Sequence, residues 1–260
     1  MKTVYLFDVD GTLTPPRQPM RKGFAEFFRK FVVSHNVILV SGSDYAKLCE
    51  QVPRDILEGC AGVFGCSGAE FLENGNLVFR KMHTFPEAML DMINAYVDQS
   101  TYPLRLGTHV EFRPGMLNIS VVGRKADQGQ RKAYHEWDRT HAERSRFAAK
   151  LMEHFPEYEA TCGGEISIDI VPKGWSKASV KPEVLERFPQ HRLVFFGDRM
   201  GQQGNDRPLA DALNMPSGRH LAVEVSGYKD TWIHLRHMGE QAPDQDETAP
   251  PVFAKVATRH

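Results

Sequence analysis

The sequence has 260 residues, of which 41% are hydrophobic and 25% charged, as in an ordinary soluble globular protein of one large or two modest domains. Its formal net charge of −1 provides no basic field to recruit nucleic acid or an anionic membrane, so we expect neither as a partner. The four cysteines lack CxxC spacing, and no stretch approaches the roughly 20 apolar residues that span a bilayer. We therefore expect a reduced, cytoplasmic protein.

The N-terminal part alternates strand-like and helix-like segments. Residues 3–7 form an apolar run that predicts a buried strand, and four phenylalanines follow at helical spacing within residues 24–31. Residues 36–40 and 62–64 predict two more strands, and Asp44 is a candidate N-cap for a helix between them. This alternation predicts a parallel sheet with helices on its faces.

The pattern changes in the middle of the chain. Residues 76–122 read as several strands, and a long polar stretch over 127–155 reads as a helix. From Glu165 to Ile170 apolar and polar residues alternate, which suits an antiparallel sheet with one covered and one open face. After Trp175 the earlier pattern returns, with a helix, a strand that ends before Asp198, and a further strand near residues 221–225.

These segments predict an α/β fold with an interrupted core. We expect a Rossmann-like parallel-sheet core made of residues 1–81 and 174–240, and an inserted α+β domain of residues 82–173. Residues 241–260 are polar and proline-bearing, so we expect a loose tail there.

The strongest motif is Asp8-Val9-Asp10-Gly11-Thr12, at the end of the first predicted strand. Ligand sites belong at the carboxyl ends of such strands. Two carboxylates beside a glycine turn can hold a magnesium ion and a phosphoryl group together. One aspartate can then attack phosphorus while its neighbour moves the proton. An acidic turn with no catalytic role is the alternative interpretation.

A second motif, GDRMGQQGND, brings Asp198, Asn205 and Asp206 after another strand, and supplies oxygen ligands that suit a hard cation. Taken alone it also fits an ordinary loop that leads into a helix. Ser41 ends a third strand, where its hydroxyl could bond a phosphate oxygen; Ser43 is a rival for that role, and either serine could instead cap a helix.

Basic residues supply candidate phosphate contacts. Lys177 lies where the core resumes and could neutralise a phosphoryl charge, although a single lysine is by default exposed. Arg113, Arg124 and Arg131 flank the segment MLNISVVG in the insertion. Arginine forks suit the oxygens of a phosphate that does not react, but solvated surface arginines are the plainer interpretation of each one alone.

Together these motifs resemble a known family. DVDGTLT, SGSD and GDRMGQQGND resemble the motifs of the haloacid dehalogenase superfamily. EFRPGMLNISVVGR, GGEISIDIVPKGWSK and the early PPRQ resemble signature segments of the eukaryotic-type phosphomannomutases, in order and to about residue 230. The chain departs from that family's pattern at Cys66-Ser67-Gly68, Val121, Lys173 and Arg199-Met200.

The resemblance implies a core and a cap that closes over a hexose phosphate. It implies Asp8 as nucleophile, Asp10 as general acid/base and Lys177 as the phosphate-neutralising residue. It further implies two sets of binding residues. The sugar-phosphate contacts would be Arg17, Ser41, Arg113, Arg124, Arg131, Ser167 and Asp169, and the magnesium site would draw on Asp8, Asp10, Asp198, Asn205 and Asp206.

The implied activity is the interconversion of mannose 6-phosphate and mannose 1-phosphate, with Mg²⁺ as cofactor and a hexose 1,6-bisphosphate as activator. The implied setting is a cytoplasmic homodimer joined through its caps that feeds GDP-mannose synthesis. A sugar-phosphate phosphatase, in which water takes the phosphoryl group, uses the same core chemistry. A catalytically silent sugar-phosphate binding protein is a third hypothesis, against which the intact Asp8, Asp10, Lys177 and Asp198 argue.

Overall fold

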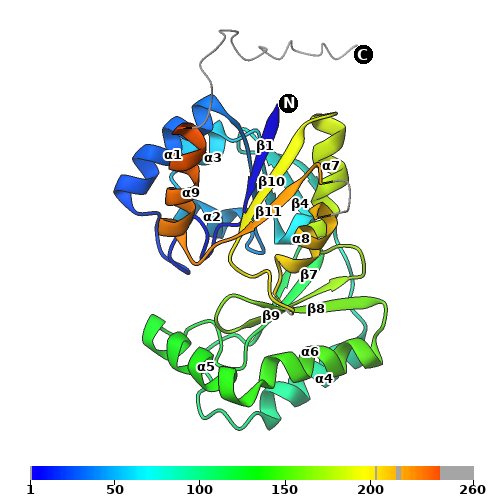
Figure 1. Cartoon of the computed structure of the whole chain (residues 1–260). Helices are drawn as coiled ribbons and strands as arrows, with labels where there is room; N and C mark the ends of the chain where they lie inside the picture. The colour runs from blue at the N-terminus through cyan, green and yellow to red at the C-terminus, as the bar shows by residue number, and fades with distance from the viewer. Residues whose placement is uncertain (1, 203, 215–217, 241–260) are drawn as a thin grey trace.

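The computed structural model describes residues 2–202, 204–214 and 218–240, built around two β-sheets (Figure 1). The strands are β1 Thr3–Phe7, β2 Asn36–Val40, β3 Gly62–Gly65, β4 Glu70–Glu73, β5 Asn76–Arg80, β6 Val110–Arg113, β7 Met116–Ile119, β8 Tyr158–Gly163, β9 Ser167–Pro172, β10 Arg192–Gly197 and β11 Leu221–Glu224. The α-helices are α1 Lys22–Ser34, α2 Tyr45–Gln51, α3 Arg54–Gly59, α4 Glu87–Gln99, α5 Gln128–His141, α6 Glu143–His154, α7 Val180–Arg187, α8 Arg207–Leu213 and α9 Tyr228–Glu240, and the short 3₁₀ helices are η1 Cys66–Gly68 and η2 Lys177–Ser179. The expected tail, residues 241–260, lies outside the described residues.

The larger sheet has the strand order β11-β10-β1-β2-β3-β4-β5. Its first five strands pair in parallel, whereas β4 and β5 are antiparallel additions at one edge. Alternate residues of each strand face opposite sides, so Phe7 packs with α1, α2, α3 and α9, while Leu6 packs with α7 and α8. Burial on both faces explains why β1, β2 and β10 are continuous apolar runs. The α/β class and the parallel strands expected from the sequence are confirmed.

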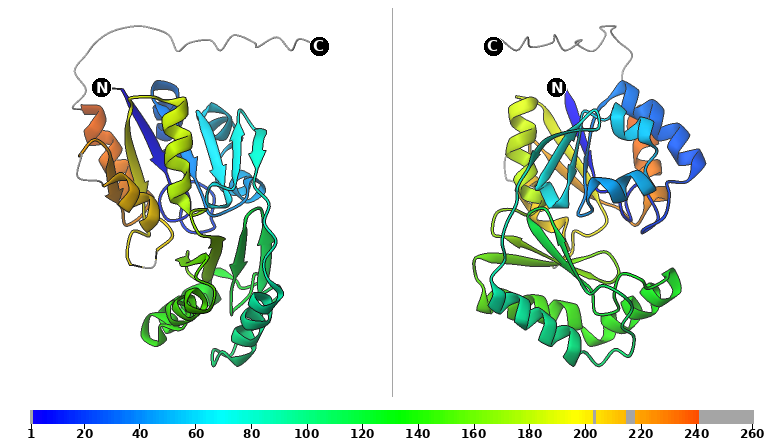
Figure 2. Two further views of the ribbon diagram at one scale, coloured as in Figure 1. Left: turned by 90° about the vertical axis from the view of Figure 1, so that its right-hand side faces the viewer. Right: turned by 180° about the vertical axis from the view of Figure 1, so that it is seen from behind.

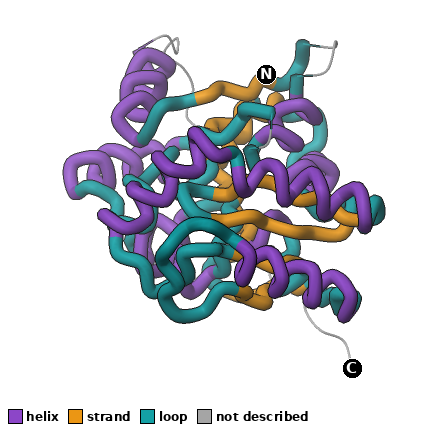
Figure 3. The backbone as a smooth tube through the Cα atoms, turned by 90° about the horizontal axis from the view of Figure 1, so that it is seen from below, coloured by secondary structure: helices purple, strands orange, loops and turns teal. Residues whose placement is uncertain are grey.

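The smaller sheet is antiparallel, in the order β6-β7-β9-β8. One face carries Leu117, Ile168 and Ile170 and packs on α4 and α6; in Figure 3, seen from below, helices of this layer lie nearest the viewer. The chain enters this part after β5 and returns to the larger sheet after β9 (Figure 2). We keep the boundaries 1–81, 82–173 and 174–240 as a proposal and call residues 82–173 the cap and the remainder the core.

The expected open face of the cap sheet is in fact covered. Ser167 and Asp169 do alternate with the isoleucines, but both are buried, because the carboxyl-end edge of the core sheet lies against them. A pattern of alternation shows which residues share a face and cannot show what lies over it. The covering of this face is what creates an enclosed site.

Two sequence expectations for the cap are wrong. Residues 76–122 contain the expected strands as β5, β6 and β7, but also an unexpected helix, α4, whose buried Met89, Ile93 and Val97 recur at helical spacing. The helix expected over 127–155 is two helices, because Ala142 adopts a left-handed conformation with φ of 51° between them. No helix in the described ranges combines the length and apolar character needed to cross a membrane.

Candidate active site

The candidate site lies where the parallel strands of the core end beneath the cap sheet. Asp8 follows β1, Ser41 follows β2 and Asp198 follows β10, and β1 pairs in parallel with both neighbours. The three side chains therefore meet at one edge. They line a single cavity whose opposite wall is formed by Asn118 and Asp169 of the cap sheet. The sequence-predicted strand ends are thus brought together.

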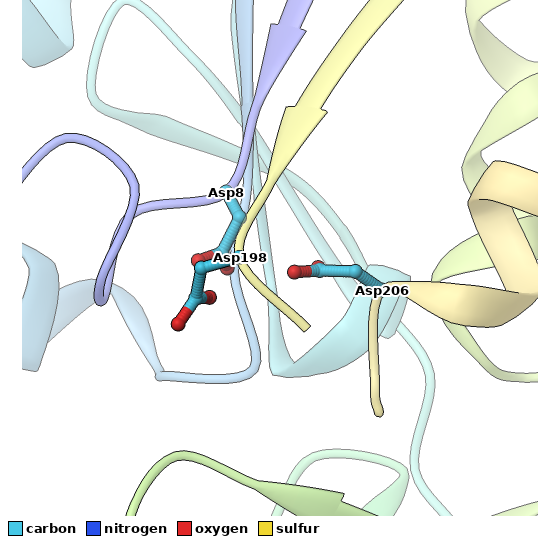
Figure 4. A group of neighbouring side chains, drawn as sticks. All are labelled: Asp8, Asp198 and Asp206. Carbon is cyan, nitrogen blue, oxygen red and sulfur yellow. The ribbon is translucent and has the colours of Figure 1, made fainter. Parts of the chain in front are cut away.

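Three carboxylates gather at the core end of this cavity (Figure 4). One oxygen from each of Asp8, Asp198 and Asp206 lies within 4.8 Å of the others. Gly11 makes this approach possible: its φ is +86°, and a Cβ on it would lie 2.3 Å from Asp198 Oδ2. Because only glycine combines that conformation with that space, the glycine of the DxDG motif is required at this position.

Lys177 holds two of these carboxylates. Its side chain is fully buried, and Nζ donates to Asp8 Oδ1 at 2.5 Å and to Asp206 Oδ1 at 2.6 Å. Burial lowers the pKa of Lys177, but the two carboxylates outweigh that effect and raise it. Lys177 therefore stays charged next to Asp8, as a residue that neutralises a phosphoryl charge must.

The acidic group nevertheless carries excess negative charge. Burial raises the pKa of Asp8 well above its usual range, with Asp206 and Asp198 adding repulsion that Lys177 opposes. Burial, followed by the charge of Asp206, raises the pKa of Asp198 to about 7. Lys177 and Arg199, whose Nε lies 3.3 Å from Asp198 Oδ2, do not balance three carboxylates. A further cation would relieve the repulsion, and oxygen ligands suit a hard one. The donor set therefore fits Mg²⁺.

The remaining predicted ligands differ in their surroundings. Asp206 is fully buried and both its oxygens are used, Oδ1 by Lys177 and Oδ2 by the Arg199 backbone N–H at 3.0 Å. Asn205 lines the cavity. The Asp10 carboxylate is not part of the acidic group: its Oδ1 accepts from Arg17 N at 2.8 Å, and its Oδ2 from Ser43 Oγ at 3.4 Å. Asp10 thus faces the cavity apart from the three clustered carboxylates.

Both serine candidates line the cavity. Ser41 Oγ accepts from the Ser43 backbone N–H at 3.0 Å, which leaves its own hydroxyl hydrogen available to a ligand. Ser43 directs its hydroxyl to Asp10. Gly42, between the two serines, lies close to the cap strand β9 and to the loop between β10 and α8. A Cβ there would be 3.3 Å from Asp169 Oδ2 and 3.5 Å from Asn205 Nδ2.

Four arginines line the other part of the cavity: Arg17 from the core, and Arg113, Arg124 and Arg131 from the cap. Their charges act on one another. Burial and then the charge of Arg113 lower the pKa of Arg124 to about 9, and burial and then Arg17 lower that of Arg131. Glu111 offsets part of this crowding through Arg113 and Arg124, but four cations still outnumber it, so this part of the cavity suits an anion and is called the anion site below.

Arg124 gives the clearest sign of an anionic ligand. Its Nη1 donates to Ser167 Oγ at 3.2 Å, whereas Nε and Nη2 are buried and make no hydrogen bond. Buried guanidinium nitrogens are rarely left unsatisfied. Nε lies 3.6 Å from Glu111 Oε2, so Nη2 is the donor that is left for an oxygen of an anion such as phosphate.

The cap sheet contributes polar side chains to the same wall. Asp169 accepts a hydrogen bond from Asn118 Nδ2, and Asn118 Oδ1 is buried with no partner. Asn118 and the Arg199 side chain, which lies 3.3 Å from Asp198 Oδ2, were not among the expected site residues although both line the cavity. The pairing of Asn118 with Asp169 across β7 and β9 could not be read from spacing alone.

Comparison with known proteins decides the family. The sequence model of the eukaryotic phosphomannomutases matches residues 24–239. The chain belongs to the eukaryotic phosphomannomutase family. It is 36% identical over 251 residues to a phosphomannomutase of Dendrobium officinale, which covers 93% of this chain and 96% of that protein. It is 39% identical over 239 residues to a phosphomannomutase of Galdieria sulphuraria, with 88% and 91% covered.

Solved structures support the fold of this phosphomannomutase family member. An IMP-bound IMP-nucleotidase of Plasmodium falciparum aligns with a TM-score of 0.63 at 13% identity, covering 92% of this chain and 68% of that one. A haloacid dehalogenase-like hydrolase of Bacteroides thetaiotaomicron aligns with a TM-score of 0.56 at 10% identity, covering 92% and 100%. The expected haloacid dehalogenase fold is confirmed.

The departures from the phosphomannomutase pattern fall at defined places. Cys66 and Ser67 both have positive φ, 49° and 57°, in the turn η1 behind the Ser41 loop. Val121 is buried in the cap, and Lys173 is exposed. Arg199 is the one of these departures that lines the cavity. None of the four removes a group of the acidic cluster or the arginine set.

Proposed function

We propose that the chain interconverts mannose 6-phosphate and mannose 1-phosphate through an aspartyl-phosphate on Asp8 and a hexose bisphosphate. The observation that carries this proposal is one cavity lined both by Asp8, which Lys177 holds from behind, and by four arginines. A hexose bisphosphate has a phosphate at each end, so one can meet Asp8 while the arginines hold the other. A mutase needs both positions.

The chemistry divides between Asp8 and Asp10. A sugar hydroxyl oxygen forms a bond to the phosphorus on Asp8, its proton passes to the Asp10 carboxylate, and the bond from phosphorus to the Asp8 oxygen breaks. This releases the Asp8 carboxylate and a bisphosphate. The bisphosphate then reorients in the cavity so that its two phosphates exchange places. Asp8 attacks the phosphate now next to it, and Asp10 returns the proton to the departing sugar oxygen. Lys177 neutralises charge at the Asp8 end throughout.

Magnesium completes the proposed site. Asp8 and Asp198 would hold Mg²⁺, with Asn205 and Asp206 supporting it, and the ion would neutralise charge on the transferring phosphoryl group. Because the Asp10 carboxylate is not part of that cluster, we assign it the acid/base role and no ligand role through its side chain. Arg17, Arg113, Arg124 and Arg131 would bind the second phosphate, and Ser41, Ser167 and Asp169 would contact the phosphate and the sugar.

The decisive experiment separates isomerisation from hydrolysis. Purified protein is incubated with mannose 1-phosphate, Mg²⁺ and a catalytic amount of glucose 1,6-bisphosphate as activator, and mannose 6-phosphate and free phosphate are measured together. We expect isomer with little free phosphate, and neither product from Asp8→Asn. Free phosphate without isomer would instead identify a sugar-phosphate phosphatase, and binding without either product a silent binding protein.

The setting of the enzyme is part of the proposal. We infer a cytoplasmic homodimer joined through the caps that supplies mannose 1-phosphate for GDP-mannose synthesis, in line with the family resemblance and the absence of a membrane-spanning helix among the described residues. Light scattering of the whole chain tests the dimer. A monomer at micromolar concentration would contradict it.

A further inference from the structure

An ion pair joins the core to the cap outside the catalytic cavity. Lys47 on α2 of the core contacts Glu111 Oε1 on β6 of the cap. Lys47 is fixed from its own side, because Nζ also lies 3.0 Å from Asp44 Oδ2, and Asp44 caps the start of α2. Neither Lys47 nor Glu111 lines the catalytic cavity. The pair therefore bridges the two parts without touching the site of reaction.

The second oxygen of Glu111 extends this bridge to the arginine set. Oε2 accepts from Arg113 Nε at 2.9 Å and lies 3.6 Å from Arg124 Nε. Burial raises the pKa of Glu111, but Arg113, Lys47 and Arg124 outweigh it and lower the pKa to about 2. The carboxylate is therefore ionised at neutral pH, and it connects a core lysine to two arginines of the anion site.

Arg113 makes a second contact across the same boundary. Its Nη1 donates to the backbone oxygen of Gly42 at 2.8 Å, in the loop that carries both serine candidates. Elsewhere at the boundary, Cys162 of β8 forms an isolated bridge with Gly204 of the core. Gln18 of the core also donates from Nε2 to Gln128 Oε1 of the cap. Lys47 and Glu111 thus lie at one of several places where the cap meets the core, and theirs is attached to the arginines.

We propose that Lys47 is a positioning residue that holds the cap closed through Glu111, and so directs the Asp8 phosphoryl group to the sugar rather than to water. This inference rests on the proposed mutase function. When the cap is closed, water is excluded and the sugar hydroxyl is the available acceptor. When the cap opens early, a water oxygen bonds to phosphorus, its proton passes to Asp10, and the bond to Asp8 breaks to give inorganic phosphate and the free carboxylate.

The test compares four forms of the full chain: wild type, Lys47→Met, Lys47→Arg and Lys132→Met. Lys132 is the matched control, because it pairs with Glu136 inside the single helix α5 of the cap and bridges nothing. Each form is given mannose 1-phosphate, Mg²⁺ and catalytic glucose 1,6-bisphosphate. The ratio of mannose 6-phosphate formed to inorganic phosphate released is then measured.

We expect Lys47→Met to lower this ratio about fivefold, which corresponds to about 1 kcal/mol of closing free energy. Lys47→Arg should restore most of the ratio, and Lys132→Met should match wild type. A lysine that only stabilised α2 would lower the amount of active enzyme and leave the ratio unchanged. An unchanged ratio in Lys47→Met would overturn the proposal.

Small-angle X-ray scattering of the same four proteins without substrate separates this proposal from the mutase assignment. A larger radius of gyration for Lys47→Met than for the other three supports closure by Lys47, even if wild type forms no isomer. Equal radii for all four overturn it. The absence of isomer from wild type would count against the mutase function and not against the ion pair.

Discussion

The two ends of the cavity are built in opposite ways. At the core end, Asp8, Asp206 and Lys177 hold one another through short contacts, and Asp206 has both oxygens occupied. At the arginine end, Arg124 keeps two buried nitrogens without a hydrogen bond. The core end is thus assembled before substrate arrives, as preorganised catalysis requires, whereas the arginine end is completed only by its ligand.

The same contrast appears in the charges. Burial and mutual repulsion raise the pKa of Asp8 and Asp198 at one end, and burial and neighbouring cations lower the pKa of Arg124 and Arg131 at the other. The acidic end therefore favours a cation beyond Lys177 and Arg199, and the arginine end favours an anion beyond Glu111. A sugar phosphate with a magnesium ion supplies both, so we expect ligand binding to stabilise the fold.

Asp8→Asn should have the largest effect on activity. It removes the nucleophile and leaves the arginine end intact, so turnover should fall by a factor on the order of 10⁴ or more while mannose 1-phosphate still binds. Product formation and calorimetric binding measure the two effects separately. Loss of binding together with turnover would show that the two ends are not independent.

Lys177→Met should have the largest effect on stability. It leaves Asp8 and Asp206 buried without their shared cation, and breaking a buried ion pair in this way costs about 3–5 kcal/mol. Denaturant unfolding in a chelator measures the loss. Lys181→Met is the matched control, since Lys181 bonds only a backbone oxygen, that of Ala212, among its described contacts. Equal losses in both variants would contradict the prediction.

Arg124→Met should spare the core end. It removes a buried guanidinium with an unbonded Nη2 donor from the anion site, so we expect KM for mannose 1-phosphate to rise on the order of 100-fold with a smaller change in kcat. Steady-state kinetics provide both values, and Arg139→Met, an exposed change on α5, controls for lost surface charge. A fall in kcat alone would place Arg124 at the reacting phosphate instead.

The smallest expected effect concerns the pH dependence of the acidic end. The pKa of Asp198 is raised from 3.8 to about 7, so between these values the folded chain holds a proton that the unfolded chain has lost. This stabilisation is present at low pH and disappears as pH rises through about 7. In a chelator, Tm should fall by a few degrees between about pH 6 and pH 8 from this group.

Two comparisons isolate that contribution. Asp198→Asn should show a shallower fall of Tm with pH, because it has no proton to lose. Mg²⁺ should raise the Tm of wild type more at the higher pH, where it no longer competes with the proton. If the Tm of wild type and the Tm of Asp198→Asn change equally with pH, Asp198 does not titrate in this range.

The sequence predicted the core end better than the cap. Its strands are apolar runs that end at Asp8, Ser41 and Asp198, and parallel pairing forces those ends together. The helix α4 was not predicted, although Met89 and Ile93 mark its buried face, because strand-like segments flank it on both sides. The break at Ala142 depends on tertiary packing that spacing does not encode.

The positions of the predicted site residues show the same limit. The sequence predicted Asp8 and Lys177 as residues of one site, but the contact of Lys177 with Asp206 and the separation of Asp10 from the carboxylates depend on how the loops fold. Burial of Ser167 and Asp169 depends on the core lying over them. Contacts between distant segments depend on how those segments pack, so local motifs and spacing do not reveal them.

Substitutions at Gly42 can measure how closely the cap must approach the core for the reaction to occur. A Cβ at this position would lie in ordinary or slightly tight contact with both Asp169 and Asn205. Side chains of increasing size at residue 42, from alanine to serine to valine, would hold Asp169 of the cap progressively further from the core. The size at which isomerisation fails while hydrolysis persists would give the clearance that the reaction tolerates.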